Sequence, residues 1–67
     1  MDAAKSLAAN LRRLRAERGW SQEDLSERSG LHRTYVSGLE RGVRNPTLGV
    51  LETLACAFAT DIAEFLR

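Results

Sequence analysis

The chain has 67 residues and a formal net charge of +1, which limits it to one domain with a small core. Such a core usually needs a disulfide, a metal or a partner subunit to stabilise it. Cys56 is the only cysteine and His32 the only histidine, so an internal disulfide is excluded and a zinc site is disfavoured. No apolar run approaches the ~20 residues that span a bilayer, and no secretory signal is recognisable. We therefore expect a homo-oligomer in a reducing cytoplasm.

Charge is distributed unevenly along the chain. Residues 5–44 carry nine lysines and arginines against five acidic residues, a net charge of +4. Residues 45–67 carry one arginine against three acidic residues, a net charge of −2. This division indicates an anion-binding part followed by a more apolar part that contacts a protein partner. An ordinary mixed surface is the alternative, because the whole chain is nearly neutral.

Apolar residues at helical spacing predict an all-α fold with five short helices. The first helix is expected over residues 3–18, where Leu7, Leu11 and Leu14 form one stripe. Gly19 is placed to end this helix in the left-handed conformation.

The second helix has a clear start signal. Ser21 and Asp24 have the S-x-x-D spacing of a capping box, and Trp20 and Leu25 are placed as a hydrophobic staple around it. Gly30 ends this helix after about two turns.

The third and fourth helices are delimited by weaker signals. His32 takes the N-cap position of the third helix, although histidine is a poor cap, and Gly42 ends it. A turn follows at Pro46, after which Thr47 caps the fourth helix. The apolar face of the fourth helix consists of Leu48, Leu51, Leu54, Ala55 and Phe58.

Two short helices joined at Gly30 and Leu31 form a helix-turn-helix pattern. Residues 21–26 (SQEDLS), 29–31 (SGL), 35–42 (YVSGLERG) and 44–47 (RNPT) together resemble the lambda-repressor-like (XRE) helix-turn-helix family. The resemblance extends from residue 11 to residue 66. Within that family, residues 33–40 are most similar to the controller proteins of restriction–modification systems.

The resemblance implies a five-helix bundle whose third helix reads the major groove of double-stranded DNA. The family's base-reading positions fall on Arg33, Thr34, Ser37 and Gly38. Gly38 replaces what is often a long side chain, so we expect no base contact there. The phosphate-binding positions fall on Gln22, Arg41, Arg44 and Asn45. The family also pairs an arginine of the first helix with the glutamate that ends the third, which implies a structural ion pair between Arg15 and Glu40.

Helical geometry supports this assignment independently. At about 100° per residue, Arg33, Ser37, Arg41 and Thr34 share an arc of about 100°, and Leu39 falls on the opposite side. Arginine can donate two hydrogen bonds to guanine, and threonine offers a hydroxyl and a methyl group to base edges. This shared face fits what the resemblance implies, that Arg33 reads a base and Arg41 holds a phosphate.

Several other residues have open or structural interpretations. Tyr35 borders the apolar face and either packs at the core edge or touches a base. Cys56 lies off the core stripe of the fourth helix, at a subunit interface or in solvent. Trp20 is expected to pack as a staple and not to stack on bases.

A fifth helix is expected to start at a D-x-x-E capping box formed by Asp61 and Glu64. Its apolar side chains surround most of its circumference, so we expect them to face a second copy of the chain. The expected dimer interface consists of Ile62, Phe65 and Leu66. The alternative is that these residues fold back and complete the core of their own chain.

The leading interpretation is a dimeric, operator-binding transcriptional regulator that uses no cofactor, metal or small-molecule ligand. An antitoxin-like interaction module with secondary DNA binding is the alternative from another class. An enzyme is disfavoured, because the sequence offers no paired nucleophile and base, no metal-ligand set and no phosphate loop.

Overall fold

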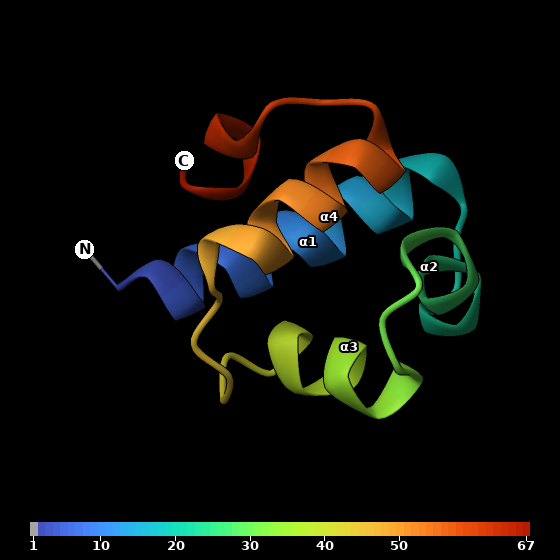
Figure 1. The fold of residues 1–67 in the computed structure, drawn as a ribbon, viewed down its shortest axis with the longest axis horizontal. Coiled ribbons are helices and arrows are strands. Elements are labelled where there is room, and N and C mark those ends of the chain that lie inside the picture. The colour runs from blue at the N-terminus through green and yellow to red at the C-terminus, as the bar shows by residue number, and fades with distance from the viewer. Residues whose placement is uncertain (1) are drawn as a thin grey trace.

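The computed structural model describes residues 2–67, and this part of the chain is helical and contains no strand. Four α-helices are followed by a single 3₁₀ turn at the C-terminal end (Figure 1). Their bounds are Ala3–Arg18 for α1, Gln22–Ser29 for α2, Arg33–Glu40 for α3, Leu48–Phe58 for α4 and Ile62–Phe65 for the 3₁₀ turn η1. The all-α prediction is confirmed, but the predicted fifth helix is only this turn.

Each α-helix begins at a side-chain cap. Ser21 and Asp24 form the predicted capping box, in which each side chain accepts a hydrogen bond of 2.9 Å from the other residue's backbone N–H. His32 Nδ1 accepts from the Thr34 N–H at 3.1 Å, and Thr47 Oγ1 accepts from the Val50 N–H at 3.1 Å. These bonds satisfy N–H groups that lack helical partners. The cap of α1 was not predicted: Asp2 accepts hydrogen bonds from the backbone N–H groups of Ala4 and Lys5.

Left-handed residues of two kinds end the described helices: Gly19, Gly30 and Gly42 follow α1, α2 and α3, and Ala59 follows α4. Gly19 ends α1 with φ +69°, as predicted. Ala59 ends α4 with φ +53°, although it carries a Cβ. At Gly19 and at Ala59, the N–H of the left-handed residue and that of the next residue both donate to carbonyls in the last turn of the helix, which is the Schellman arrangement.

The core is built from leucines and two phenylalanines contributed by every element. The ring centroid of Trp20 lies 4.9 Å from that of Phe58, and the Arg28 guanidinium lies 4.3 Å from the Trp20 centroid. Trp20 therefore covers the core, as expected, and is not free to stack on a base. The fully buried large side chains are Leu7, Leu11, Leu25, Val36, Leu39, Leu54, Phe58 and Phe65.

The C-terminal turn corrects two predictions. Asp61 makes no side-chain capping hydrogen bond, so the predicted D-x-x-E capping box is absent. Phe65 is 0% exposed and meets Phe58 edge-on, with 5.9 Å between ring centroids. The turn packs on α1 and α4, and Phe65 belongs to the same buried cluster as the leucines of α1 and Phe58 of α4. The assignment of Phe65 to a dimer interface is therefore wrong, while Ile62 and Leu66 remain partly exposed.

Candidate nucleic-acid interface

The turn between α2 and α3 is fixed by local hydrogen bonds. Gly30 adopts φ +78°, and its N–H donates to the Ser26 carbonyl at 2.9 Å. The Ser26 hydroxyl donates to the Leu31 carbonyl at 2.6 Å, and the Leu31 N–H donates to Ser29 Oγ at 3.1 Å. These bonds hold α3 at a defined angle to α2, so that one face of α3 packs on the core and the other faces solvent.

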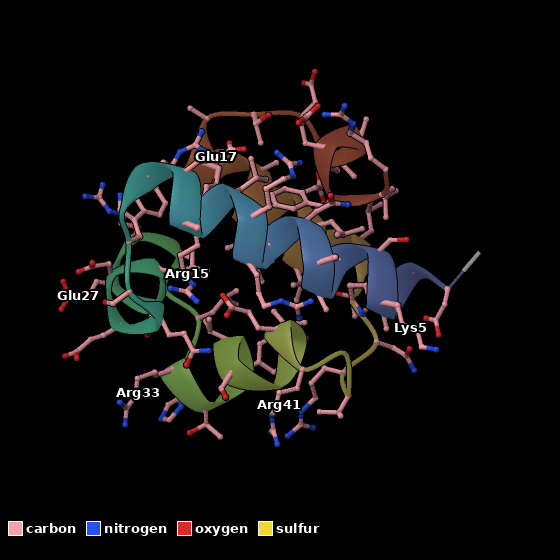
Figure 2. The ribbon with its side chains drawn as sticks, turned by 180° about the vertical axis from the view of Figure 1, so that it is seen from behind. Lys5, Arg15, Glu17, Glu27, Arg33 and Arg41 are labelled. Atoms are coloured by element: carbon pink, nitrogen blue, oxygen red, sulfur yellow. The ribbon has the colours of Figure 1, made fainter. Side chains whose placement is uncertain are left out.

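The solvent-facing side of α3 carries the predicted DNA contacts. Arg33 and Arg41 project from opposite ends of α3, away from α1 (Figure 2). Five predicted contact residues line one open depression of about 290 Å³. They are Gln22, Arg33, Thr34, Ser37 and Arg41. Residues from two helices thus form a single hydrogen-bonding surface with two fixed positive charges, which we call the α3 face.

The other two predicted contacts lie in the loop after α3. Arg44 is exposed, and its guanidinium carbon lies 6.0 Å from the Tyr35 ring centroid. Tyr35 is half-buried and packs against the core, in agreement with the core-edge interpretation. Asn45 is exposed in the same loop. The structure therefore brings Arg44 next to α3 and leaves Asn45 in the turn beyond it.

Glu40 is buried at the centre of a charged network that joins three helices. The Arg15 guanidinium donates to both carboxylate oxygens, at 2.7 and 3.0 Å, so the expected ion pair is present. The Glu40 side chain is only 4% exposed, and the hydrogen bond to it raises the pKa of Arg15 above its ordinary value. Gln22 Nε2 also donates to Glu40, at 3.1 Å. Gln22 is thus held by the fold before any phosphate is bound, with one amide hydrogen and its carbonyl oxygen left over.

Three arginines of α1 donate hydrogen bonds to backbone carbonyls, contacts that were not predicted from the sequence. Arg12 donates to the Glu40 carbonyl, and Arg18 donates to the Phe58 carbonyl at 2.8 Å. Arg15 also donates to the Trp20 carbonyl at 2.7 Å. Carbonyls at the ends of helices lack helical donors, and such side chains can supply them. The paired residues lie up to 40 positions apart in the sequence, so no local sequence pattern predicts these bonds. Three of the nine basic residues of 5–44 therefore make hydrogen bonds within the fold.

The structure offers no basis for several other kinds of site. Within residues 2–67 no group of three or more histidine, cysteine, aspartate or glutamate side chains is arranged to hold a metal ion. No helix in the same range has the length and apolar character needed to cross a membrane. Cys56 is exposed in the single chain, in a groove that Arg28 and Glu52 also line.

The fold and this interface define the class of protein. The profile of the helix-turn-helix family matches residues 11–65, so the chain belongs to the lambda-repressor-like (XRE) helix-turn-helix family. Its relatives in that family include controller proteins of restriction–modification systems. The chain is 47% identical over 66 residues to the control protein C.SmaI of Serratia marcescens, an alignment that covers 98% of this chain and 79% of the relative.

Solved structures of controller proteins superpose along nearly the whole chain. The restriction–modification controller protein C.AhdI of Aeromonas hydrophila gives a TM-score of 0.87 at 42% identity, covering 92% of this chain and 94% of that one. The controller protein C.Esp1396I, solved as a tetramer in complex with its natural 35-base-pair operator, gives a TM-score of 0.84 at 32% identity. This second match covers 100% of this chain and 99% of the relative.

Proposed function

We propose that this chain is a sequence-specific DNA-binding transcriptional regulator that acts as a homodimer on a palindromic operator. The observation that carries this proposal is the α3 face, on which Arg33, Thr34, Ser37, Arg41 and Gln22 lie together and open to solvent. An outward helix of eight residues with arginines at both ends is suited to the major groove, where one face of a helix meets base edges.

Each residue of the α3 face has a distinct proposed role. Arg33 lies in the first turn, which enters the groove most deeply, and donates two hydrogen bonds to O6 and N7 of a guanine. Thr34 and Ser37 present hydroxyl groups to neighbouring base edges. Arg41 binds a phosphate at the rim of the groove. Gln22 binds a second phosphate at the N-terminus of α2, where free N–H groups and the helix dipole favour an anion.

A dimer places two α3 faces on one duplex. A two-fold axis would set the two recognition helices about 34 Å apart, one helical turn of DNA, so the operator would be palindromic. The partly exposed side chains of Ile62 and Leu66 are proposed to contact the partner subunit. The start of α4 lies at the same end of the molecule as the C-terminal turn (Figure 1), and Leu48 there is 67% exposed, so we add it to this interface.

The biological role proposed is control of a restriction–modification system. C.SmaI, C.AhdI and C.Esp1396I are controller proteins by name, and C.Esp1396I is seen on its operator. The alignment with C.Esp1396I runs over the full length of this chain, so the α3 face falls within the shared fold.

Selection of bound sequences from a random DNA pool, followed by salt titration on the selected duplex, tests the proposal. If a dimer neutralises about six phosphates, log K should fall against log salt with a slope near −5. Arg28→Ala is the matched control, because Arg28 packs over Trp20 and does not line the α3 face; it should leave the slope unchanged. A flat salt response, or equal affinity for a scrambled duplex, would contradict the proposal.

A further inference from the structure

Gly38 lies in the middle of α3 and is buried, although it belongs to the helix that carries the DNA-reading residues. It is covered by the side chain of Arg44. A Cβ atom at position 38 would lie 2.9 Å from Arg44 Cγ, 3.2 Å from Arg44 Nε and 3.7 Å from Arg44 Cδ. The first of these distances is too short for two carbon atoms that are not bonded. The stem of Arg44 therefore occupies the space that any other residue at position 38 would fill.

The backbone after α3 brings Arg44 to this place. Gly42 adopts φ +74°, its N–H donates to the Leu39 carbonyl at 3.1 Å, and the Val43 N–H donates to the Gly38 carbonyl at 3.2 Å. This is a Schellman motif, which turns the chain back along the helix it ends. Arg44 then lies across α3 at Gly38, with its guanidinium carbon 6.0 Å from the Tyr35 ring centroid.

Gly38 has no role of its own in the helix. Its φ lies in the ordinary range, since the left-handed glycines are Gly19, Gly30 and Gly42. Glycine is less favourable than alanine inside a helix because its backbone loses more freedom on folding. The seat for Arg44 is the feature of the structure that requires a glycine at this position.

We propose that Gly38 is a positioning residue for DNA binding: its missing side chain seats Arg44 across α3, so that a loop arginine becomes part of the DNA-facing surface. This inference rests on the proposed function. With the Arg44 stem held against α3, its guanidinium is directed to the DNA without the freedom of an unsupported loop side chain. Less conformational entropy is then lost when Arg44 meets a phosphate.

The variant Gly38→Ala tests the proposal by separating stability from binding. The added methyl group meets only an exposed, flexible side chain, so Arg44 swings away and the backbone stays in place. The melting temperature should stay the same or rise, because alanine favours the helix. Affinity of the dimer for the selected duplex should fall about a hundredfold, because one charge-assisted contact worth about tenfold is lost in each subunit. The salt slope should become shallower by about 2 for a dimer, one phosphate per subunit.

Two further variants make the result specific. Gly49→Ala is the matched control, since Gly49 lies in α4 and a Cβ there meets only Thr47 Oγ1 at an ordinary 3.9 Å; its affinity should equal that of the wild type. Arg44→Ala should reproduce the loss and the shallower slope, and Gly38→Ala should add nothing to it. Additive losses, or a Gly38→Ala protein that binds with wild-type affinity and slope, would overturn the proposal.

A measurement without DNA keeps this inference distinct from the proposed function. In NMR spectra of the free wild-type protein, the side-chain protons of Arg44 should show nuclear Overhauser contacts with the Gly38 α-protons. Gly38→Ala should abolish the close packing and shift the Arg44 resonances, whereas Gly49→Ala should not. If the wild type lacks these contacts, the seat is absent and the inference fails. If they are present but no duplex is bound specifically, the proposed function fails, and with it the binding role assigned to the seat.

Discussion

Arg33 and Arg41 carry the same charge on the same face, but their positions along α3 predict different losses. Arg33→Ala should weaken operator binding by about 1–3 kcal/mol and relax specificity at one base pair in each half-site, because a bidentate contact to guanine is lost. Arg41→Ala should weaken binding to operator and scrambled duplexes alike. Binding curves of both variants on the two duplexes, measured at one salt concentration, make the comparison.

The two arginines serve as controls for each other in that experiment. An equal loss on both duplexes for Arg33→Ala would show that Arg33 holds a phosphate. A loss restricted to the operator for Arg41→Ala would move the base-reading role to the end of α3.

The buried ion pair predicts an asymmetric effect on stability. Arg15→Ala leaves the Glu40 carboxylate, 4% exposed, with only Gln22 as a side-chain partner and should cost about 3–5 kcal/mol of unfolding free energy. Glu40→Ala should cost less, because the Arg15 side chain is 22% exposed and can reach water. Chemical denaturation of both variants without DNA measures the two losses. No loss for Arg15→Ala would mean that the carboxylate is hydrated in solution, and equal losses would contradict the predicted asymmetry.

Roles of single residues were predictable from the sequence where a helix face or a family position fixed them. Arg33, Thr34, Ser37 and Arg41 share a face because helical geometry alone places them there. The hydrogen bond from Gln22 to Glu40 was not predictable, since it depends on how α2 and α3 pack. The packing of the Arg44 side chain on Gly38 was also not predictable, because it depends on both the glycine in the helix and the path of the loop.

At the scale of the helices, the end of α4 is the one place within residues 2–67 where a residue other than glycine has a left-handed backbone. Ala59 has φ +53°, a conformation that costs a non-glycine residue about 1–2 kcal/mol. Ala59→Gly should therefore raise the unfolding free energy by about 0.5 kcal/mol, after the greater flexibility of glycine in the unfolded chain is subtracted. Thermal melts detect this as a small rise in melting temperature.

Gly30→Ala provides the reverse substitution at the end of α2. A Cβ there meets nothing within 4 Å, while φ is +78°, so any loss comes from the backbone alone. It should lower the unfolding free energy by about 1 kcal/mol. If Ala59→Gly and Gly30→Ala both lowered the unfolding free energy, the left-handed conformation of Ala59 would not be what destabilises the end of α4.

The capping box of α2 predicts a stability change with pH. The pKa of Asp24 lies below its ordinary value. The main cause is the hydrogen bond from the Ser21 backbone N–H, and a hydrogen bond with the Ser21 side chain lowers the pKa further. A carboxylate whose pKa is lowered on folding stabilises the protein above its unfolded pKa of about 3.9. That stability is lost as the pH falls through the folded value.

Asp24→Asn should therefore flatten the dependence of melting temperature on pH between about pH 5 and pH 2. Glu52→Gln removes an exposed carboxylate of α4 that caps no helix and is the control. Identical profiles for Asp24→Asn and wild type would mean that the capping box does not form in solution.

The order and bounds of the four α-helices were predictable because their signals are local. A capping serine, a left-handed glycine and an apolar stripe each lie within a few residues of the helix end that they define. Local signals of the same kind predicted a capped helix at the C-terminal turn, and this prediction was wrong. Asp61 and Glu64 have the spacing of a capping box, but the chain there follows the fit of Phe65 against Phe58 and α1, a contact that local sequence does not encode.

At the scale of the whole molecule, the C-terminal turn contains both a core residue, Phe65, and a residue of the proposed dimer interface, Leu66. Phe65→Ala should destabilise each chain by about 3–5 kcal/mol, because it empties a fully buried site. Leu66→Glu should keep the fold and shift the dimer towards monomer, because it places a charge on a partly exposed apolar position. Sedimentation at tens of micromolar, with thermal melts of the same samples, distinguishes the two effects. A Leu66→Glu protein that remains dimeric would move the interface elsewhere.

Glu40 and the arginines of α1 tie both helices of the helix-turn-helix to the longest helix of the domain. Arg15 reaches the Glu40 carboxylate and Arg12 the Glu40 carbonyl, while Gln22 of α2 meets the same carboxylate. Detachment of α3 alone would expose this charge cluster together with the fully buried Val36 and Leu39. The free energy of this partial opening should therefore be close to that of complete unfolding. Proteases that cleave only unfolded segments would then reach α3 through global unfolding, and the rate at which the protein is degraded would follow its overall stability.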